Sequence, residues 1–201
     1  MNGRQTILRV GELALVGALV AGCLSGQRET AAPLSLTVRA ATAAETARVV
    51  RVIDADTYVL LSGSIPYRLR LLGVDAPEHD QAFGPQATDS VRRLLVPGQV
   101  VRVAKAGRDL YGRTLGAVLL PTATGAVAGR PVALDSLLVA RGWAWACDPN
   151  HRVAGRAAQQ VAAQHAGRGL WKCGAVGPVP PQLWRGFNAQ NKRRYGAGCS
   201  W

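Results

Sequence analysis

The sequence predicts a small closed β-barrel with helices, an α+β fold of five strands and three helices. Short runs of β-branched and other apolar residues, separated by turn residues, indicate strands at residues 49–53, 57–61 and 67–72. The turns between these runs are too short to hold crossover helices, which disfavours an open three-layer α/β sheet. Helical periodicity begins only after the third strand and returns towards the end of the chain.

The remaining elements follow in order along the chain. Pro85 opens the first helix, whose apolar residues recur at helical spacing up to Leu95 before Pro-Gly ends it. Two further strands are expected at residues 100–106 and 114–120, and a second helix at 132–141.

A third helix is expected after Asp148 and Pro149, which would cap it. Val153, Ala157 and Val161 would share its apolar face. Five strands, with one helix inserted after the third and others at the end, favour a barrel of the oligonucleotide-binding (OB) type. Barrels of this type bind nucleic acid on one face.

Composition and charge limit the partners of the chain. Its 201 residues are 48% hydrophobic, which indicates one globular domain with a real core and excludes a disordered chain. The 24 Lys and Arg exceed the 12 Asp and Glu and give a formal net charge of +12. A polyanion such as nucleic acid suits this charge, but the arginines could equally serve to solubilise the surface.

The N-terminus is predicted to be an export signal. Residues 1–22 combine two arginines with an apolar run too short to span a membrane, and they end in small residues directly before Cys23. This resembles a bacterial lipobox, in which Cys23 would be lipidated and anchor an exported protein in the cell envelope. The alternative is an ordinary secretory signal that is cleaved nearby and releases the protein.

The rest of the chain divides into three segments. Residues 23–45 are rich in Ala, Thr and Ser and are predicted to be a flexible tether. Residues 46–173 would form the barrel domain, and residues 174–201 an irregular tail rich in Pro, Gly and Arg. We expect the protein to be a monomer, since nothing in the sequence implies a protein partner.

Export permits disulfide bonds, and three cysteines remain if Cys23 carries lipid. Cys147 and Cys173 flank the third predicted helix, so we predict that they pair. Cys199 is then left over, although connectivity does not follow from sequence alone.

Carboxylates and arginines recur at strand-like spacing between residues 54 and 78, and a further arginine follows at 113. Carboxylates bind hard cations, and arginines bind phosphate in a bidentate manner. One site built from both predicts metal-assisted cleavage of phosphodiesters.

Three motifs carry a resemblance to the staphylococcal nuclease (thermonuclease) family, namely VIDADT at residues 52–57, RLLGVDAPE at 70–78 and DLYGR at 109–113. Their order, and further similarity up to Gly169-Leu-Trp171, extends the resemblance over about residues 46–171. The resemblance implies a five-stranded OB barrel and a calcium-dependent endonuclease. Such an enzyme would hydrolyse DNA and RNA with low sequence specificity and leave 3′-phosphate ends.

The resemblance also assigns the metal ligands. Asp56 and Asp75 would bind Ca²⁺ together with the backbone carbonyl of Ala76, and waters would complete the six to eight oxygens that calcium requires. Asp54 would lie behind these ligands, as a turn residue that satisfies backbone or neighbouring groups.

Catalysis and substrate binding would fall to residues of the second and third motifs. By resemblance, Glu78 would hold or deprotonate the attacking water, Arg70 and Arg113 would bind the phosphate, and Tyr111 would lie near the nucleotide. Phosphoryl transfer depends mainly on positioning and charge stabilisation, which two guanidinium groups supply.

The sequence departs from the staphylococcal pattern in ways that leave the preferred substrate open. Ala55 replaces a glycine, and the loop after Glu78 is short. Two rival hypotheses remain: a non-catalytic OB-fold lipoprotein that binds nucleic acid in the envelope, and a structural envelope lipoprotein that holds anionic polymers.

Overall fold

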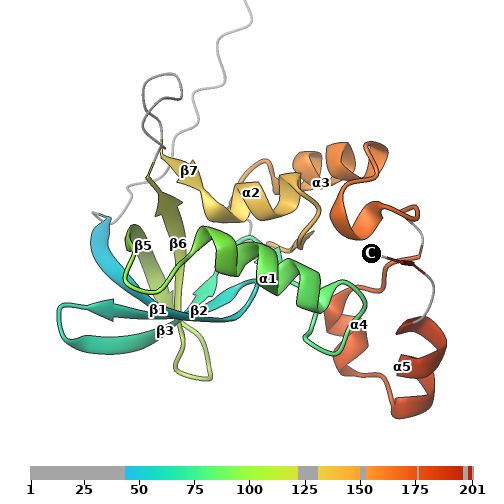
Figure 1. Cartoon of the computed structure of the whole chain (residues 1–201), viewed down its shortest axis with the longest axis horizontal. Helices are drawn as coiled ribbons and strands as arrows, with labels where there is room; N and C mark the ends of the chain where they lie inside the picture. Colours follow the sequence, from blue (N-terminus) through green and yellow to red (C-terminus); the bar gives the residue numbers. More distant parts are fainter. Residues whose placement is uncertain (1–43, 122–130, 150–152, 176, 197–198, 201) are drawn as a thin grey trace, which may run out of the picture. The chain divides into compact units, whose positions relative to one another are not determined.

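The computed structural model describes residues 44–121, 131–149, 153–175, 177–196 and 199–200 (Figure 1). The predicted signal segment, Cys23 and nearly all of the predicted tether lie outside these residues. Within the described part of the chain, we find no helix with the length and apolar character needed to cross a membrane.

Five strands form a closed barrel, which confirms the predicted fold. They are β1 (Glu45–Asp54), β2 (Thr57–Ser62), β3 (Ile65–Leu71), β5 (Val100–Arg108) and β6 (Thr114–Leu120). The sheet order is β3-β2-β1-β5-β6, and parallel pairing between β3 and β6 closes the barrel. The short β7 (Val132–Ala133) pairs antiparallel with the end of β6. The short strands β4 (Val74–Asp75) and β8 (Trp145–Ala146) pair in a second small sheet.

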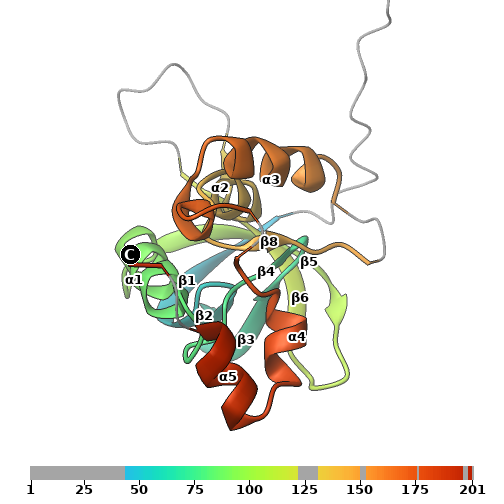
Figure 2. The same ribbon diagram turned by 90° about the vertical axis from the view of Figure 1, so that its right-hand side faces the viewer.

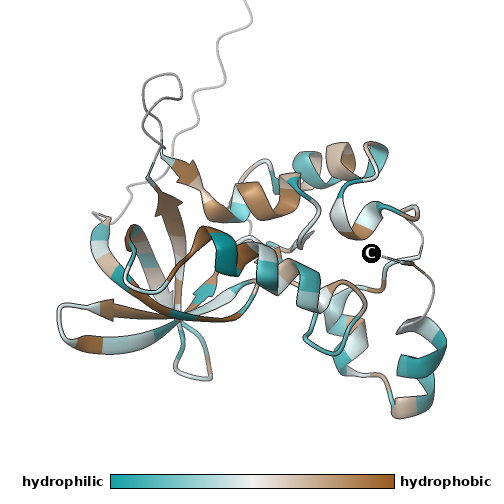
Figure 3. Cartoon of the chain, in the orientation of Figure 1, coloured by the Kyte–Doolittle hydropathy of each residue, from teal (hydrophilic) through white to brown (hydrophobic). Residues whose placement is uncertain are grey.

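The barrel interior is filled by the residues whose alternation predicted the strands. Leu69 and Leu71 on β3 are buried, whereas Arg70 between them is half-buried and Arg68 before them is exposed. Tyr58 is fully buried, and its hydroxyl donates a 2.6 Å hydrogen bond to the carbonyl of Ala55, so it is a packing residue. Figure 3 shows the apolar residues gathered on the barrel strands and on α2.

Two helices pack onto the barrel core as the sequence predicted. They are α1 (Gly84–Leu94) and α2 (Leu134–Ala140). Ala87 and Val91 of α1 and Leu134 and Leu138 of α2 are all buried. The apolar spacing of these helices therefore predicted their inward faces.

The third helix, α3 (Arg156–His165), begins later than predicted, and its predicted apolar face is wrong. The Asp148 carboxylate accepts the N–H of Val153 at 2.6 Å, but the helix starts several residues beyond it. Val161 is 51% exposed, whereas Ala163 is buried. The reason is that α3 meets α2 through polar contacts such as Arg156 with Asp135, which an apolar pattern does not reveal.

The tail beyond residue 173 was predicted to be irregular, and this prediction is wrong. A 3₁₀ turn (Gly169–Trp171) precedes the tail. The tail itself forms α4 (Pro181–Arg185) and the hydrophilic α5 (Ala189–Gly196). Both views place α4 and α5 away from α2 and α3 (Figures 1 and 2). We refer to the segment between Cys173 and Cys199 as the C-terminal arm.

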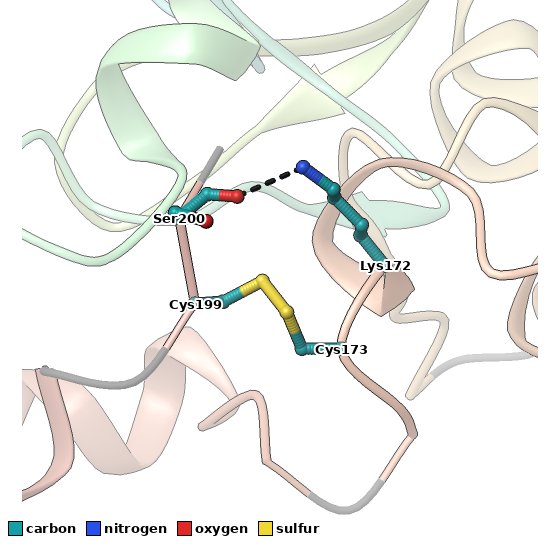
Figure 4. Close-up of a disulfide and its surroundings, with 4 residues drawn as sticks. All are labelled: Lys172, Cys173, Cys199 and Ser200. Carbon is teal, nitrogen blue, oxygen red and sulfur yellow. Dashed lines mark hydrogen bonds between the residues drawn. A yellow bond between two sulfur atoms is a disulfide. The ribbon is translucent and has the colours of Figure 1, made fainter.

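The predicted disulfide between Cys147 and Cys173 is also wrong. Cys173 is bonded to Cys199, and Lys172 next to it donates a 2.9 Å hydrogen bond to the carbonyl of Ser200 (Figure 4). Cys147 keeps a free, half-buried thiol, and its backbone N–H, directly after β8, donates to the carbonyl of Gly73 at 3.1 Å. The two helices of the arm bring Cys199 back to Cys173, and this return could not be predicted from an irregular tail.

Candidate active site

Barrel closure brings the predicted site residues together. Asp54 and Asp56 lie at the β1–β2 turn, and Arg70 on β3 is paired with Thr57 directly after that turn. The β3–β6 pairing sets Leu69 opposite Thr114, so that the preceding Arg113 reaches the same end of the barrel. Short strand β4 then carries Asp75 to this end.

The residues line an open cleft of about 590 Å³. It contains every predicted ligand, catalytic residue and substrate-binding residue, together with residues that the sequence did not single out. The lining residues are Asp54, Asp56, Thr57, Arg68, Arg70, Asp75, Ala76, Pro77, Glu78, Tyr111, Arg113 and Arg185.

Arg70 is fixed by the groups around it. Its Nη1 donates to the backbone carbonyls of Leu71 and Val74, at 2.8 and 2.9 Å. Its Nη2 donates to Asp75 Oδ1 at 2.9 Å and lies 3.2 Å from Asp56 Oδ2. Within the described chain Nε–H has no hydrogen-bond partner, so the Nε–Nη2 edge is the one that can meet a phosphate.

Asp56 and Asp75 are both buried, with 4% and 5% of their surface exposed. Burial raises the pKa of Asp56 to about 6; Arg70 opposes this shift, and the negative charge of Asp54 adds to it. Burial likewise raises the pKa of Asp75, against the hydrogen bond from Arg185. A cation bound between the two acids would favour their charged forms and so oppose these shifts.

The donor set fits a hard cation such as Ca²⁺. The described residues contain no group of three or more His, Cys, Asp or Glu side chains placed to hold a metal, and the predicted set needs only two carboxylates. Its donors are all oxygens, which calcium prefers. Ala76 reaches the cleft through its N–H, which donates to Asp56 Oδ2 at 2.6 Å, and the ligand role of its carbonyl stays a prediction.

Asp54 lies at the β1–β2 turn beside Asp56. Its Oδ1 accepts the backbone N–H of Asp56 at 3.0 Å across the β1–β2 turn. Thr57 donates its hydroxyl to Asp56 Oδ1 at 3.0 Å. These contacts orient the buried Asp56 carboxylate from the side away from Arg70.

Glu78 lies at the start of a tight loop. Its backbone N–H donates to the Gln81 side chain at 3.1 Å, and its carbonyl accepts the N–H of Gln81 at 2.9 Å. Gly84 packs so closely on this loop that a Cβ atom there would lie 1.9 Å from the Glu78 carbonyl oxygen. The glycine at the start of α1 is therefore needed to place Glu78.

Arg113 and Tyr111 lie in the β5–β6 turn. Asp109 accepts Arg113 Nε at 2.7 Å and the backbone N–H groups of Tyr111 and Arg113 at 2.9 Å. Burial alone would raise the pKa of Asp109, but these hydrogen bonds together lower it. The Nη groups of Arg113 make no hydrogen bond to the described residues and can therefore bind a ligand. Tyr111 is 85% exposed, and its ring centre lies 5.6 Å from the Arg113 guanidinium carbon.

Two further arginines line the cleft that were not predicted from the sequence, Arg68 and Arg185. Arg68 alternates with Arg70 along β3, so the period of two could have found it. Arg185 comes from α4 of the arm and donates to Glu78 Oε1 at 2.6 Å and to Asp75 Oδ2 at 3.1 Å. No local signal links it to residues more than a hundred positions earlier.

Comparison with known proteins identifies the family. The sequence model for staphylococcal nuclease homologues matches residues 68–173. The chain belongs to the staphylococcal nuclease family. As a member of this family it is a nuclease, with the family's barrel and a cleft at the expected motifs.

Three bacterial nucleases are among the relatives that the chain is similar to. It is 36% identical to an uncharacterized endonuclease of Escherichia coli O157:H7 over 138 residues, which cover 69% of this chain and 83% of the relative. It is 38% identical to a micrococcal nuclease of Shigella flexneri over 98 residues, 49% of this chain and 56% of that protein. It is 39% identical to the thermonuclease of Staphylococcus hyicus over 84 residues, 38% of this chain and 49% of that protein.

Proposed function

We propose that this nuclease is a calcium-dependent endonuclease that hydrolyses DNA and RNA with low sequence specificity and leaves 3′-phosphate ends. The observation that carries the proposal is the pair of buried carboxylates, Asp56 and Asp75, placed within 3.2 Å of Arg70 in a cleft shared with Glu78 and Arg113. Acidic ligands, a general base and two phosphate-binding cations are the parts that metal-assisted phosphodiester hydrolysis requires.

Each side chain has a separate task in this reaction. Glu78 accepts the proton of the attacking water, and its side chain is 35% exposed, so water can reach it. Arg70 binds the phosphate with its Nε–Nη2 edge, and Arg113 binds it with its Nη groups, which stabilises charge in the transition state. A calcium ion held by Asp56 and Asp75 would polarise the phosphoryl group.

Low sequence specificity follows from the chemistry of the cleft. Its cationic groups suit phosphate oxygens, which carry no sequence information. The exposed Tyr111 ring can stack on any base, since every base has a π face. The net charge of +12 supports attraction to polyanions in general.

The test is digestion of supercoiled plasmid and of RNA with added calcium and then with excess chelator. The proposal expects cutting of both substrates, its loss in chelator, and products that a 3′-phosphatase converts into primers for a polymerase. Gel retention of nucleic acid without cutting, with or without calcium, would instead support the non-catalytic binding protein.

We further propose that the protein is exported as a monomer and anchored to the envelope by lipid on Cys23. The support is the short apolar segment and the small residues before this cysteine. Labelling with a radioactive fatty acid should mark the wild-type protein but not Cys23→Ala, and the variant should leave the membrane fraction. A wild-type protein recovered only in the medium would favour the secreted form.

A further inference from the structure

The C-terminal arm is bound to the loop that follows Glu78. Trp184 is 2% exposed, and its indole N–H donates to Asp80 Oδ1 at 2.9 Å. Lys192 donates to the other oxygen of the same carboxylate at 2.7 Å, and the Gln81 side chain donates to the carbonyl of Val179. The Cys173–Cys199 bond joins the two ends of the arm (Figure 4). Together these contacts hold the arm beside the cleft.

This placement directs one side chain of the arm into the cleft. Nη1 of Arg185 donates to Glu78 Oε1 at 2.6 Å and, more weakly, to Asp75 Oδ1 at 3.4 Å. Its Nη2 donates to Asp75 Oδ2 at 3.1 Å. The guanidinium therefore links the carboxylate assigned to the metal with the carboxylate assigned to proton transfer, and it engages both oxygens of Asp75.

We propose that Arg185 is a positioning residue of the active site, which holds Glu78 beside Asp75 and lowers the affinity of the site for calcium. The inference rests on the proposed calcium-dependent function. It adds a role for the arm, which lies outside the segment that matches the family.

Competition with calcium follows from the contacts of Asp75. Its Oδ1 accepts from Arg70 at 2.9 Å, and its Oδ2 accepts from Arg185 at 3.1 Å. A divalent cation at this carboxylate must share the oxygens with two guanidinium groups and lies close to their positive charge. Removing Arg185 frees Oδ2 and leaves the ligand set more negative, and calcium affinity rises with ligand charge.

Positioning of Glu78 has the opposite consequence for the rate. The Glu78 side chain is 35% exposed, and its 2.6 Å contact with Arg185 restricts where its carboxylate lies. Without that contact the carboxylate samples positions away from the attacking water, so turnover falls although calcium binds more tightly. A merely structural role would lower both quantities together.

The test is calorimetric titration of Ca²⁺ into the full chain, compared among wild type, Arg185→Gln and Arg193→Gln. Arg193 is the matched control, since it is an exposed arginine of the same arm that does not line the cleft. We expect Arg185→Gln to bind calcium about fivefold more tightly than wild type, and Arg193→Gln to match wild type.

Turnover at saturating calcium provides the second readout. It should fall about tenfold in Arg185→Gln, with KM changed less than kcat. Arg185→Lys should restore a calcium affinity near that of wild type, because it restores the charge, but only part of the rate, because an ammonium lacks the planar fork.

Unchanged or weaker calcium binding by Arg185→Gln, beside a wild type that binds calcium and cuts, would overturn this inference alone. Absence of calcium binding from both proteins would overturn the calcium-dependent function as well. Tighter binding together with a lower kcat supports the proposal.

Discussion

Asp56 is a buried acid whose charge opposes folding. Its pKa is raised by burial from 3.8 to about 6. Because the folded-state pKa lies above the unfolded value, the stability that this group contributes is fully present below about pH 4 and is lost as the pH rises through about 6. Asp75, whose pKa is also raised, contributes with the same sign.

We therefore expect Asp56→Asn in chelator to raise the free energy of unfolding at pH 7 by about 2 kcal/mol. The wild type should gain stability as the pH falls from 7 to 4, and the variant should gain less. Urea denaturation across this pH range measures both effects. Asp89→Asn, at an exposed pair with Arg92, is the control and should change neither. A variant that is less stable than wild type at pH 7 in chelator would contradict the burial argument.

Glu78 provides the second test at the scale of single residues. Glu78→Gln removes the proton acceptor but keeps the shape of the side chain, so kcat should fall by about 10²–10⁴-fold while the melting temperature changes little. Single-turnover cleavage of a labelled oligonucleotide at saturating calcium measures the effect. The adjacent His79→Ala is the control, because His79 is an exposed loop residue; an equal loss in both variants would show that the loop, and not the carboxylate, had been damaged.

The start of α1 decides where the Glu78 loop lies. A Cβ atom at Gly84 would meet the Glu78 carbonyl oxygen at 1.9 Å, and that oxygen is backbone that cannot turn aside. Gly84→Ala should therefore shift the loop, lower kcat/KM by about 10²-fold and reduce stability. Gly177→Ala, where nothing lies within 4 Å of the added Cβ, should leave both unchanged. Wild-type kinetics in Gly84→Ala would mean that the loop does not position Glu78.

Elements could be predicted from the sequence where burial alternates with exposure. The β3 run of Leu69 and Leu71 around Arg70 predicted a strand, and Ala87 and Val91 predicted the inner face of α1. The pattern failed for α3, because its contacts with α2 include the ion pair of Arg156 with Asp135. Polar contacts of this kind produce no periodic pattern of apolar residues in the sequence, so the inner face of the helix cannot be predicted from such a pattern.

The whole molecule shows why part of the site could be predicted and part could not. Asp56, Asp75 and Glu78 lie within one local stretch of sequence, whose strand spacing already placed them near each other. Arg185 reaches Glu78 across 107 positions, through an arm whose Pro-rich sequence has no apolar period. The docked Trp184 and the Cys173–Cys199 bond help to fix that contact, and neither is visible as a local pattern in the sequence.

The disulfide should stabilise the arm rather than the barrel. The bond closes a segment of 26 residues, for which chain entropy predicts about 3.5 kcal/mol. Trp184 is buried, but it is not part of the apolar cluster that fills the barrel and packs α1 and α2 against it. Loss of the bond should consequently release the arm while the barrel stays folded.

Cys199→Ser therefore should speed amide hydrogen exchange in α4 and α5 by about two orders of magnitude and leave β2, β3 and β6 protected as in wild type. Mass spectrometry of the peptides from residues 177–196 and 57–71 measures the two regions. Cys147→Ser is the control, since this thiol is free and should affect neither region. Equal loss of protection in barrel and arm would show that the bond stabilises the whole molecule, and unchanged exchange in the arm would show that Trp184 and Asp80 hold it without the bond.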